Sequence, residues 1–186
     1  MDVNAVLKDY FLKFGKDRHV DANQPLLRAG EVAKYFYLIQ SGAVRLCMRN
    51  AEGGETSIQF FFEGEMVCSL ESMVSSCPSG LDLITMEPCH LRVMDRDTVL
   101  TKVLPTAAMQ TQLLALTQQR LIHYIRLYTS AIAQTPTQRY QAMLAAQPDK
   151  LTRVPLHILA GYLGVTPVHL SRIRRKLKSS PDSGAV

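Results

Sequence analysis

The segment that most constrains this chain lies near its C-terminus, where PLHILAGYLGVTPVHLSRIRRKL occupies residues 155–177. The pattern predicts two short helices joined by a tight turn. Gly164 can adopt a backbone conformation that a β-carbon penalises, and Thr166 can cap the second helix with Pro167 at its first position. Small and apolar residues fall where such a pair must pack: Leu159, Ala160, Leu163, Val165, Leu170 and Ile173. The segment therefore predicts a helix-turn-helix, with an ordinary surface helical hairpin as the alternative.

The outward positions of the second predicted helix would face the major groove of DNA. Val168 can contact a thymine methyl group, and Arg172 can bind guanine through two hydrogen bonds. His169 can serve either bases or phosphates. The positions expected to contact phosphate are Thr166, Ser171, Arg175 and Lys178.

Charge is distributed unevenly along the chain. Residues 1–135 carry 13 Lys/Arg and 14 Asp/Glu, whereas residues 136–186 carry 8 Lys/Arg and 2 Asp/Glu. A basic C-terminal module on a nearly neutral body indicates a polyanionic partner for that module. A solvated basic face is the simpler alternative, and the helix-turn-helix pattern argues against it.

Several classes of protein are disfavoured by the sequence. The first residues lack the layout of a secretory signal, and no apolar stretch is long enough to span a membrane, so a cytoplasmic protein is expected. The four cysteines form no CxxC pair and no Cys/His cluster, which predicts reduced thiols rather than a zinc or iron–sulfur site. No metal site, cofactor or catalytic residue is expected, although the pattern leaves haem open.

The hydrophobic pattern changes along the chain. It predicts a helix over about residues 2–14 and a helical segment over about 97–134, with a restart at Pro105, then a hinge at 135–137 and a helix over 138–146. Between them, short strands are expected at 36–39, 43–48, 56–62, 81–86 and 90–94. The expected domains are a jelly roll (1–97), a central dimerisation helix (98–134), a helix-turn-helix domain (135–178) and a disordered tail (179–186).

The central helix has an apolar seam of the coiled-coil kind. Leu114, Leu121 and Tyr128 are seven residues apart, and Thr117 and Tyr124 interleave with them. A second apolar face contains Leu113, Leu116, Ile122, Ile125 and Ile132. One face is expected to pack on the strands and the other on a second subunit. A helix buried within one chain is the alternative.

This order of elements resembles the cyclic-AMP receptor protein/FNR (CRP/FNR) family of bacterial transcription regulators. The resemblance rests on LLRAGEVAKYFYLIQSGAVRLC (26–47), FFEGEMV (61–67) and the segment at 155–177. It implies an α+β fold: a jelly roll like a cyclic-nucleotide-binding domain, a long dimerisation helix and a winged helix-turn-helix, here without the second wing hairpin. It also implies a homodimer that binds a two-fold symmetric DNA site.

The ligand pocket of the family is degenerate here. The family's Gly-Glu and Arg-Ser/Thr pairs, which hold the ribose and the cyclic phosphate, correspond to Cys68-Ser69 and Ser79-Gly80. No Arg or Lys lies between Arg49 and Arg92, so a buried phosphate would lack a cationic partner. We therefore expect no ordinary binding of cyclic AMP. The polar candidates for another effector are Glu65, Ser69, Ser79, Tyr124 and Tyr128.

The resulting hypothesis is a homodimeric, sequence-specific DNA-binding regulator of transcription, with RNA polymerase and an unknown small molecule as further candidate partners. A second hypothesis is a jelly-roll sensor whose C-terminal helices bind a protein. A third, a cupin-like metalloenzyme, needs clustered histidines, but the strand region holds only His19 and His90.

Overall fold

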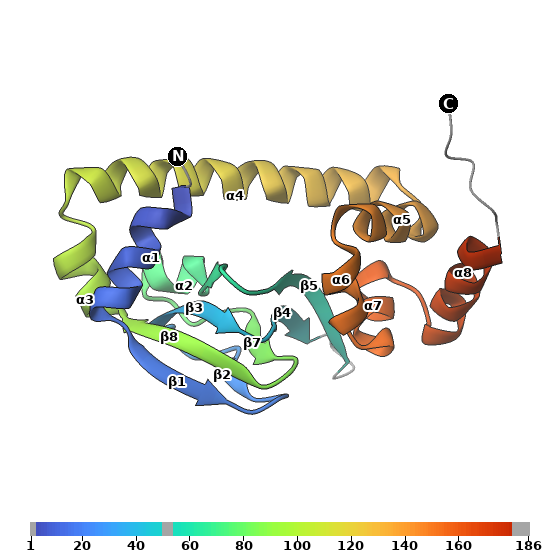
Figure 1. Cartoon of the computed structure of the whole chain (residues 1–186), viewed down its shortest axis with the longest axis horizontal. Coiled ribbons are helices and arrows are strands. Elements are labelled where there is room, and N and C mark those ends of the chain that lie inside the picture. Colours follow the sequence, from blue (N-terminus) through green and yellow to red (C-terminus); the bar gives the residue numbers. More distant parts are fainter. Residues whose placement is uncertain (1–2, 50–53, 180–186) are drawn as a thin grey trace.

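The computed structural model describes residues 3–49 and 54–179. Figure 1 shows a β domain, a long helix lying across it and a helical C-terminal part. The helices are α1 (Val3–Phe14), α2 (Leu70–Ser75), α3 (Arg96–Thr98), α4 (Ala107–Ala133), α5 (Pro136–Ala146), α6 (Pro148–Arg153), α7 (Leu156–Leu163) and α8 (Pro167–Ser179), with a π-helical turn, Val99–Val103, before α4. The strands are β1 (Lys16–Val20), β2 (Pro25–Leu27), β3 (Tyr35–Ser41), β4 (Val44–Arg49), β5 (Glu55–Phe61), β6 (Met66–Val67), β7 (Asp82–Thr85) and β8 (Cys89–Asp95).

The β domain consists of two four-stranded sheets, ordered β1-β8-β3-β6 and β2-β7-β4-β5. Every strand pair is antiparallel. Inward-facing side chains of both sheets, including Tyr37, Leu83 and Leu91, fill the space between them. This arrangement confirms the expected jelly roll.

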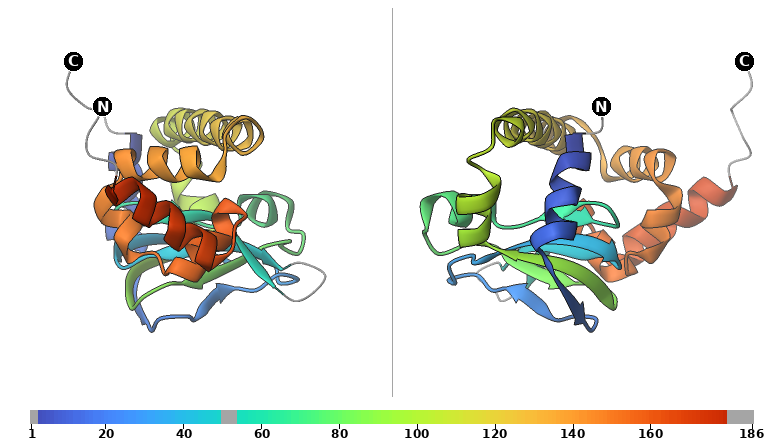
Figure 2. Two further views of the ribbon diagram at one scale, coloured as in Figure 1. Left: turned by 90° about the vertical axis from the view of Figure 1, so that its right-hand side faces the viewer. Right: turned by 60° about the vertical axis from the view of Figure 1, so that its left-hand side comes forward.

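The central helix is interrupted near its start, as the sequence predicted. The chain turns at Pro105 and Thr106, and Thr106 has an extended backbone immediately before α4. The N-terminal helix packs between α4 and the β domain, where Phe11 joins Val103 and Met109 in a buried cluster. Figure 2 shows α1 lying beneath α4, so that α1 connects the long helix to the sheets.

The C-terminal part begins with a well-capped helix. The Thr135 hydroxyl accepts a hydrogen bond from the Gln138 backbone N–H at 3.3 Å, and the Gln138 side chain returns one to the Thr135 backbone. This capping box fixes the start of α5. Helix α6 follows directly after α5, with Pro148 in its first turn.

The helix-turn-helix is formed by α7 and α8. Gly164 between them has φ +69°, the left-handed conformation that the turn requires. Leu159, Leu163 and Leu170 are completely buried in the cluster that joins the two helices to α5 and α6. The predicted helical pair is therefore present.

Some predicted details differ from the structure. Strands β1, β2 and β6 and helix α2 were not anticipated. Among the described residues no strand follows β8, so this part of the chain has no wing. The expected disordered tail begins at residue 179, which is the last residue of α8, and 180–186 lie outside the described residues. Within the described part, no helix combines the length and apolarity required to cross a bilayer.

Candidate nucleic-acid interface and ligand sites

Helix α8 has one buried face and one solvent-exposed face. Leu170 and Ile173 are buried against α7, whereas Val168 is 62% exposed. Because Val168, Arg172 and Arg175 are spaced by four and three residues, they lie along one side of the helix. In Figure 1 this helix occupies the outer end of the molecule, away from the sheets. The exposed side is therefore accessible to a large partner.

The predicted DNA-binding residues lie on this exposed side, with two qualifications. His169, Ser171, Arg172 and Arg175 are exposed. Thr166 is exposed as well, but its Oγ1 accepts a hydrogen bond from the His169 N–H at 3.2 Å and so caps α8. The side chain of Lys178 lies outside the described residues.

Not every basic side chain of the C-terminal part is available to a partner. The Arg174 guanidinium donates to the Tyr140 hydroxyl at 3.1 Å and lies over its ring. Arg139 donates to the Leu163 carbonyl at 2.6 Å, at the end of α7. These two arginines stabilise the packing of the helices. A count of charges along the sequence does not distinguish them from arginines that are free to bind a partner.

The two serines that the sequence predicts at the family's nucleotide-contacting positions hydrogen-bond to each other. The Ser69 and Ser79 hydroxyl oxygens are 2.9 Å apart. Ser79 donates to the Leu81 carbonyl at 2.9 Å and accepts from the Leu81 N–H at 3.1 Å. Since a hydroxyl has one proton and two lone pairs, Ser69 must be the donor to Ser79, whose hydrogen-bonding capacity is then saturated. We call Ser69, Ser79 and Leu81 the serine turn.

The side chain that precedes Ser69 in the sequence is uncharged. Burial raises the pKa of the Cys68 thiol to about 12, so this side chain carries no charge. One cation approaches from α4, which the sequence argument did not consider. Arg120 donates to the Met66 carbonyl at 2.7 Å and lies over the Phe61 ring. Its guanidinium is thus already bound to the protein.

The remaining candidate effector residues lie elsewhere. None of the contacts described for Glu65 reaches the serine turn. Its carboxylate lies 3.4 Å from the Lys150 ammonium of α6. Burial raises the pKa of Glu65. Tyr124 and Tyr128 are 41% and 69% exposed on α4. The structure therefore brings Ser69 and Ser79 together, but it does not gather all five candidates into one pocket.

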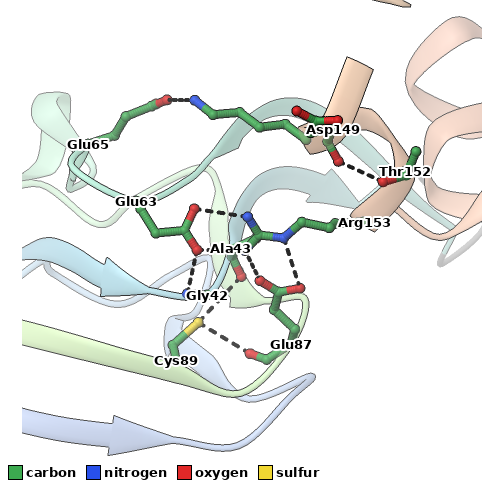
Figure 3. Close-up of polar contacts among 10 residues, drawn as sticks. Gly42, Ala43, Glu63, Glu65, Glu87, Cys89, Asp149, Thr152 and Arg153 are labelled. Carbon is green, nitrogen blue, oxygen red and sulfur yellow. Dashed lines mark hydrogen bonds and ion pairs between the residues drawn. The ribbon is translucent and has the colours of Figure 1, made fainter. Parts of the chain in front are cut away.

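An ion cluster joins the β domain to the C-terminal part (Figure 3). Arg153 of α6 donates to both carboxylate oxygens of Glu63, at 2.9 and 2.7 Å, and also to Glu87. Glu63 accepts a further bond from the Gly42 N–H at 2.9 Å. Hydrogen bonding from Arg153 is the main reason why the pKa of Glu63 falls to about 2. We call Arg153, Glu63 and Glu87 the interdomain ion cluster.

Apolar packing accompanies this ion cluster. Phe62 and Met86 of the β domain belong to the same buried cluster as Val154, Ile158 and Leu159 of the C-terminal part. Hydrophobic contact and charge pairing therefore hold the helix-turn-helix against the β domain. This interface is not apparent from the sequence.

The structure contains two cavities of note. One, of about 500 Å³, is a groove at the rim of the β domain lined by residues such as Leu27, Val32 and Tyr35. The other, of about 240 Å³, lies where β5, α4, α5, α6 and α7 meet, and its lining includes Gln59, Glu65 and Lys150. Within the described residues, no group of His, Cys, Asp and Glu side chains is arranged to hold a metal ion.

Helix α4 exposes a broad apolar surface. The predicted seam residues Leu114, Leu121 and Tyr128 are 61%, 59% and 69% exposed, and Thr117 lies between them. Of the second apolar face, only Leu116 packs inward; the other members remain largely exposed: Leu113, Ile122, Ile125 and Ile132. We call these apolar residues, together with Tyr124, the α4 surface.

Comparison with known proteins identifies the fold. Residues 17–104 match the family model described as a cyclic nucleotide-binding domain. The structure is similar to CLP, a c-di-GMP-responsive global regulator from Xanthomonas campestris, with a TM-score of 0.71 and 21% identity over 94% of this chain and 92% of that one. It is similar to FixK2 from Bradyrhizobium japonicum, with a TM-score of 0.79 and 18% identity over 92% and 89%.

The catabolite activator protein of Thermus thermophilus is also similar, with a TM-score of 0.56 and 22% identity over 94% of this chain and 83% of that one. No curated protein sequence matches the chain. Its N-terminal part is thus a domain of the cyclic-nucleotide-binding type. Over nearly its whole length the chain has the fold of the CRP/FNR regulators, as the sequence resemblance indicated.

Proposed function

We propose that this chain is a homodimeric, sequence-specific DNA-binding regulator of transcription that does not respond to cyclic AMP, rather than an enzyme. The observation that carries the proposal is the two-sided character of α8. Leu170 and Ile173 are buried, and the exposed side presents Val168, Arg172 and Arg175. Such a helix can enter the major groove, where one side chain reads bases and others bind phosphates.

The α4 surface supports a dimer as the functional form. Exposed apolar residues extend along almost the full length of the helix, and soluble monomers rarely leave such a surface uncovered. Pairing two α4 helices along Leu114, Leu121 and Tyr128 would cover it. Two copies of α8 could then bind successive major grooves, roughly one helical turn of DNA apart.

The serine turn supports independence from cyclic AMP. A cyclic phosphate would have to displace hydrogen bonds that Ser69 and Ser79 already make, at a site where Arg120 is bound to the Met66 carbonyl. We expect calorimetric titration with cyclic AMP to give no binding heat. Binding at micromolar concentration would contradict this part of the proposal.

The base-reading role is tested by Arg172→Ala. The variant should lose roughly 1–3 kcal/mol of affinity, about 5- to 150-fold, for a site selected from random DNA, and should lose much less for unrelated DNA. Arg175→Ala is the matched control, because loss of a phosphate contact weakens binding to all sequences alike. Mobility shifts on selected and shuffled duplexes measure both effects.

Two results would count against this function. Equal loss on every duplex after Arg172→Ala would remove the base-reading role. Binding by the unaltered chain without any sequence preference, and with a steep dependence on salt, would instead favour C-terminal helices that bind a protein partner.

The dimer is tested by Leu121→Glu. A buried, unpaired carboxylate in the middle of the seam should convert the dimer to a monomer in sedimentation velocity and lower DNA affinity with it. Gln119→Glu adds the same charge on the exposed opposite side of α4 and should remain dimeric. A wild-type chain that sediments as a monomer would contradict the proposal.

A further inference from the structure

The cavity of about 240 Å³ lies where the three parts of the molecule meet. Phe60 and Glu65 contribute to it from the β domain, Leu127 from α4, and Lys150 and Tyr162 from the C-terminal part. A molecule bound there would contact all three parts at once. We call this space the interdomain cavity. It is separate from the serine turn, since neither Ser69 nor Ser79 is among its lining residues.

One part of the cavity wall is aromatic. The Phe60 and Tyr162 rings have centroids 5.1 Å apart at an interplanar angle of 47°. Leu127 and Met143 add apolar surface. A flat, largely apolar body would pack against such walls, because aromatic faces and edges offer both dispersion and favourable ring geometry.

One polar group of the cavity lacks a hydrogen-bond partner. Gln59 is only 8% exposed, and its Oε1 has no hydrogen-bond partner among the described residues. A buried acceptor without a donor destabilises the folded chain. Glu65, by contrast, already has partners: its carboxylate lies 3.4 Å from the Lys150 ammonium and also interacts with the Phe62 backbone. The Gln59 side chain would therefore gain from an N–H donor supplied by a ligand.

The charges of the cavity favour a neutral ligand. The Glu65 carboxylate and the Lys150 ammonium line it and offset each other. His123 lines it as well, and burial together with the nearby Arg120 and Arg126 lowers its pKa, which favours the neutral imidazole. A phosphate or carboxylate ligand would have to approach Glu65, whereas a cation would have to approach Lys150. Either would bury an additional charge without a partner of its own.

We propose that the interdomain cavity binds a neutral, planar heteroaromatic molecule whose ring N–H donates a hydrogen bond to Gln59. The closed contact between the helix-turn-helix and the β domain forms part of the site. A ligand that binds this arrangement more tightly than any other therefore stabilises it. Regulation of DNA affinity by the ligand rests on the DNA-binding function proposed above, whereas binding itself does not.

Indole and 1-methylindole form a matched pair of probes that differ in the ring N–H. The chain contains no Trp, so indole fluorescence can be followed during titration of the full chain without tryptophan background. Indole should bind saturably, and 1-methylindole should bind at least tenfold more weakly because it cannot donate to Gln59. Each tenfold corresponds to about 1.4 kcal/mol.

Two substitutions locate the binding. Gln59→Leu should reduce indole affinity at least tenfold and leave 1-methylindole unchanged, whereas Gln141→Leu, on the exposed surface of α5, should change neither. Ala146→Leu, which narrows the cavity from the α5 side, should weaken both probes. The comparison of the two probes on the unaltered chain remains decisive if Gln59→Leu does not fold.

Absence of saturable indole binding, equal affinity for the two probes, or an unchanged indole affinity in Gln59→Leu would each overturn the proposal. Mobility shifts run in parallel separate its failure from that of the proposed function. Sequence-specific DNA binding without indole binding would refute the cavity alone. Indole binding by a chain that recognises no DNA sequence would support the proposed binding site and refute its role in regulating DNA binding.

Discussion

The serine turn and the interdomain ion cluster differ in how their polar groups are paired. In the serine turn, neutral hydroxyls and backbone groups satisfy one another, and Ser79 has no hydrogen-bonding capacity left for a ligand. In the ion cluster, one arginine serves two carboxylates that come from different loops of another domain. The first arrangement closes a site within one domain, and the second connects two domains.

This difference indicates where a signal can act on the molecule. The serine turn is a poor binding site for a charged ligand. An anion bound there would lose its hydration and would break hydrogen bonds that the turn already makes. Charges between domains are sensitive to whatever moves the domains apart, because each loses its partner when the interface opens. Control of α8 is therefore expected at the interface beside the interdomain cavity rather than at the serine turn.

The strongest test of this contrast is Arg153→Gln. Removing the guanidinium leaves Glu63 and Glu87 close together without their cation. We expect a loss of about 2 kcal/mol in the free energy of unfolding, after allowance for partial exposure of the three side chains. Urea unfolding measures the loss. Hydrogen exchange should rise in α6 and α7 before it rises in the sheets.

Arg126→Gln is the matched control for this substitution, because Arg126 is exposed on α4 and should be replaceable without cost. If the two variants unfold alike and exchange stays uniform, the ion cluster does not hold the domains together.

Ser79→Ala should have a smaller effect, within the β domain alone. It removes the acceptor of the Leu81 N–H and of the Ser69 hydroxyl, at a cost of about 1 kcal/mol. Urea unfolding again provides the measurement, with exposed Ser75→Ala as the neutral control. An alanine variant as stable as the unaltered chain would mean that the serine turn is not structurally required.

The helix-turn-helix could be predicted from sequence because its determinants are local. Gly164 supplies the left-handed turn, Thr166 caps α8, and the buried Leu170 and Ile173 recur at helical spacing. Strand β1 was missed because four of its five residues, from Lys16, are exposed and give no apolar alternation. A strand without a buried side does not show the alternation of apolar and polar residues that predicts a strand.

The interdomain ion cluster could not be predicted from the sequence. Arg153 lies 66 residues from Glu87 and 90 from Glu63, and each side chain alone is an ordinary surface charge. Arg120 was overlooked for the same reason: it reaches the β domain from α4, outside the segment searched for cations. Contacts between distant segments depend on how the domains pack, which local patterns do not encode.

The smallest predicted effect is the pH dependence that Glu63 contributes. Hydrogen bonds from Arg153 lower the pKa of this carboxyl from its ordinary value near 4.5 to about 2. Since the folded value is the lower one, the carboxylate contributes its stability above about pH 4.5 and loses it progressively as the pH falls toward 2.

The free energy of unfolding, measured with urea from pH 5 to pH 2, should therefore fall less steeply for Glu63→Gln, whose amide does not titrate. Glu71→Gln, in the exposed part of α2, should follow the unaltered chain. Parallel curves for all three proteins would mean that Arg153 does not favour the charged form of Glu63, and that the cluster holds the domains by packing alone.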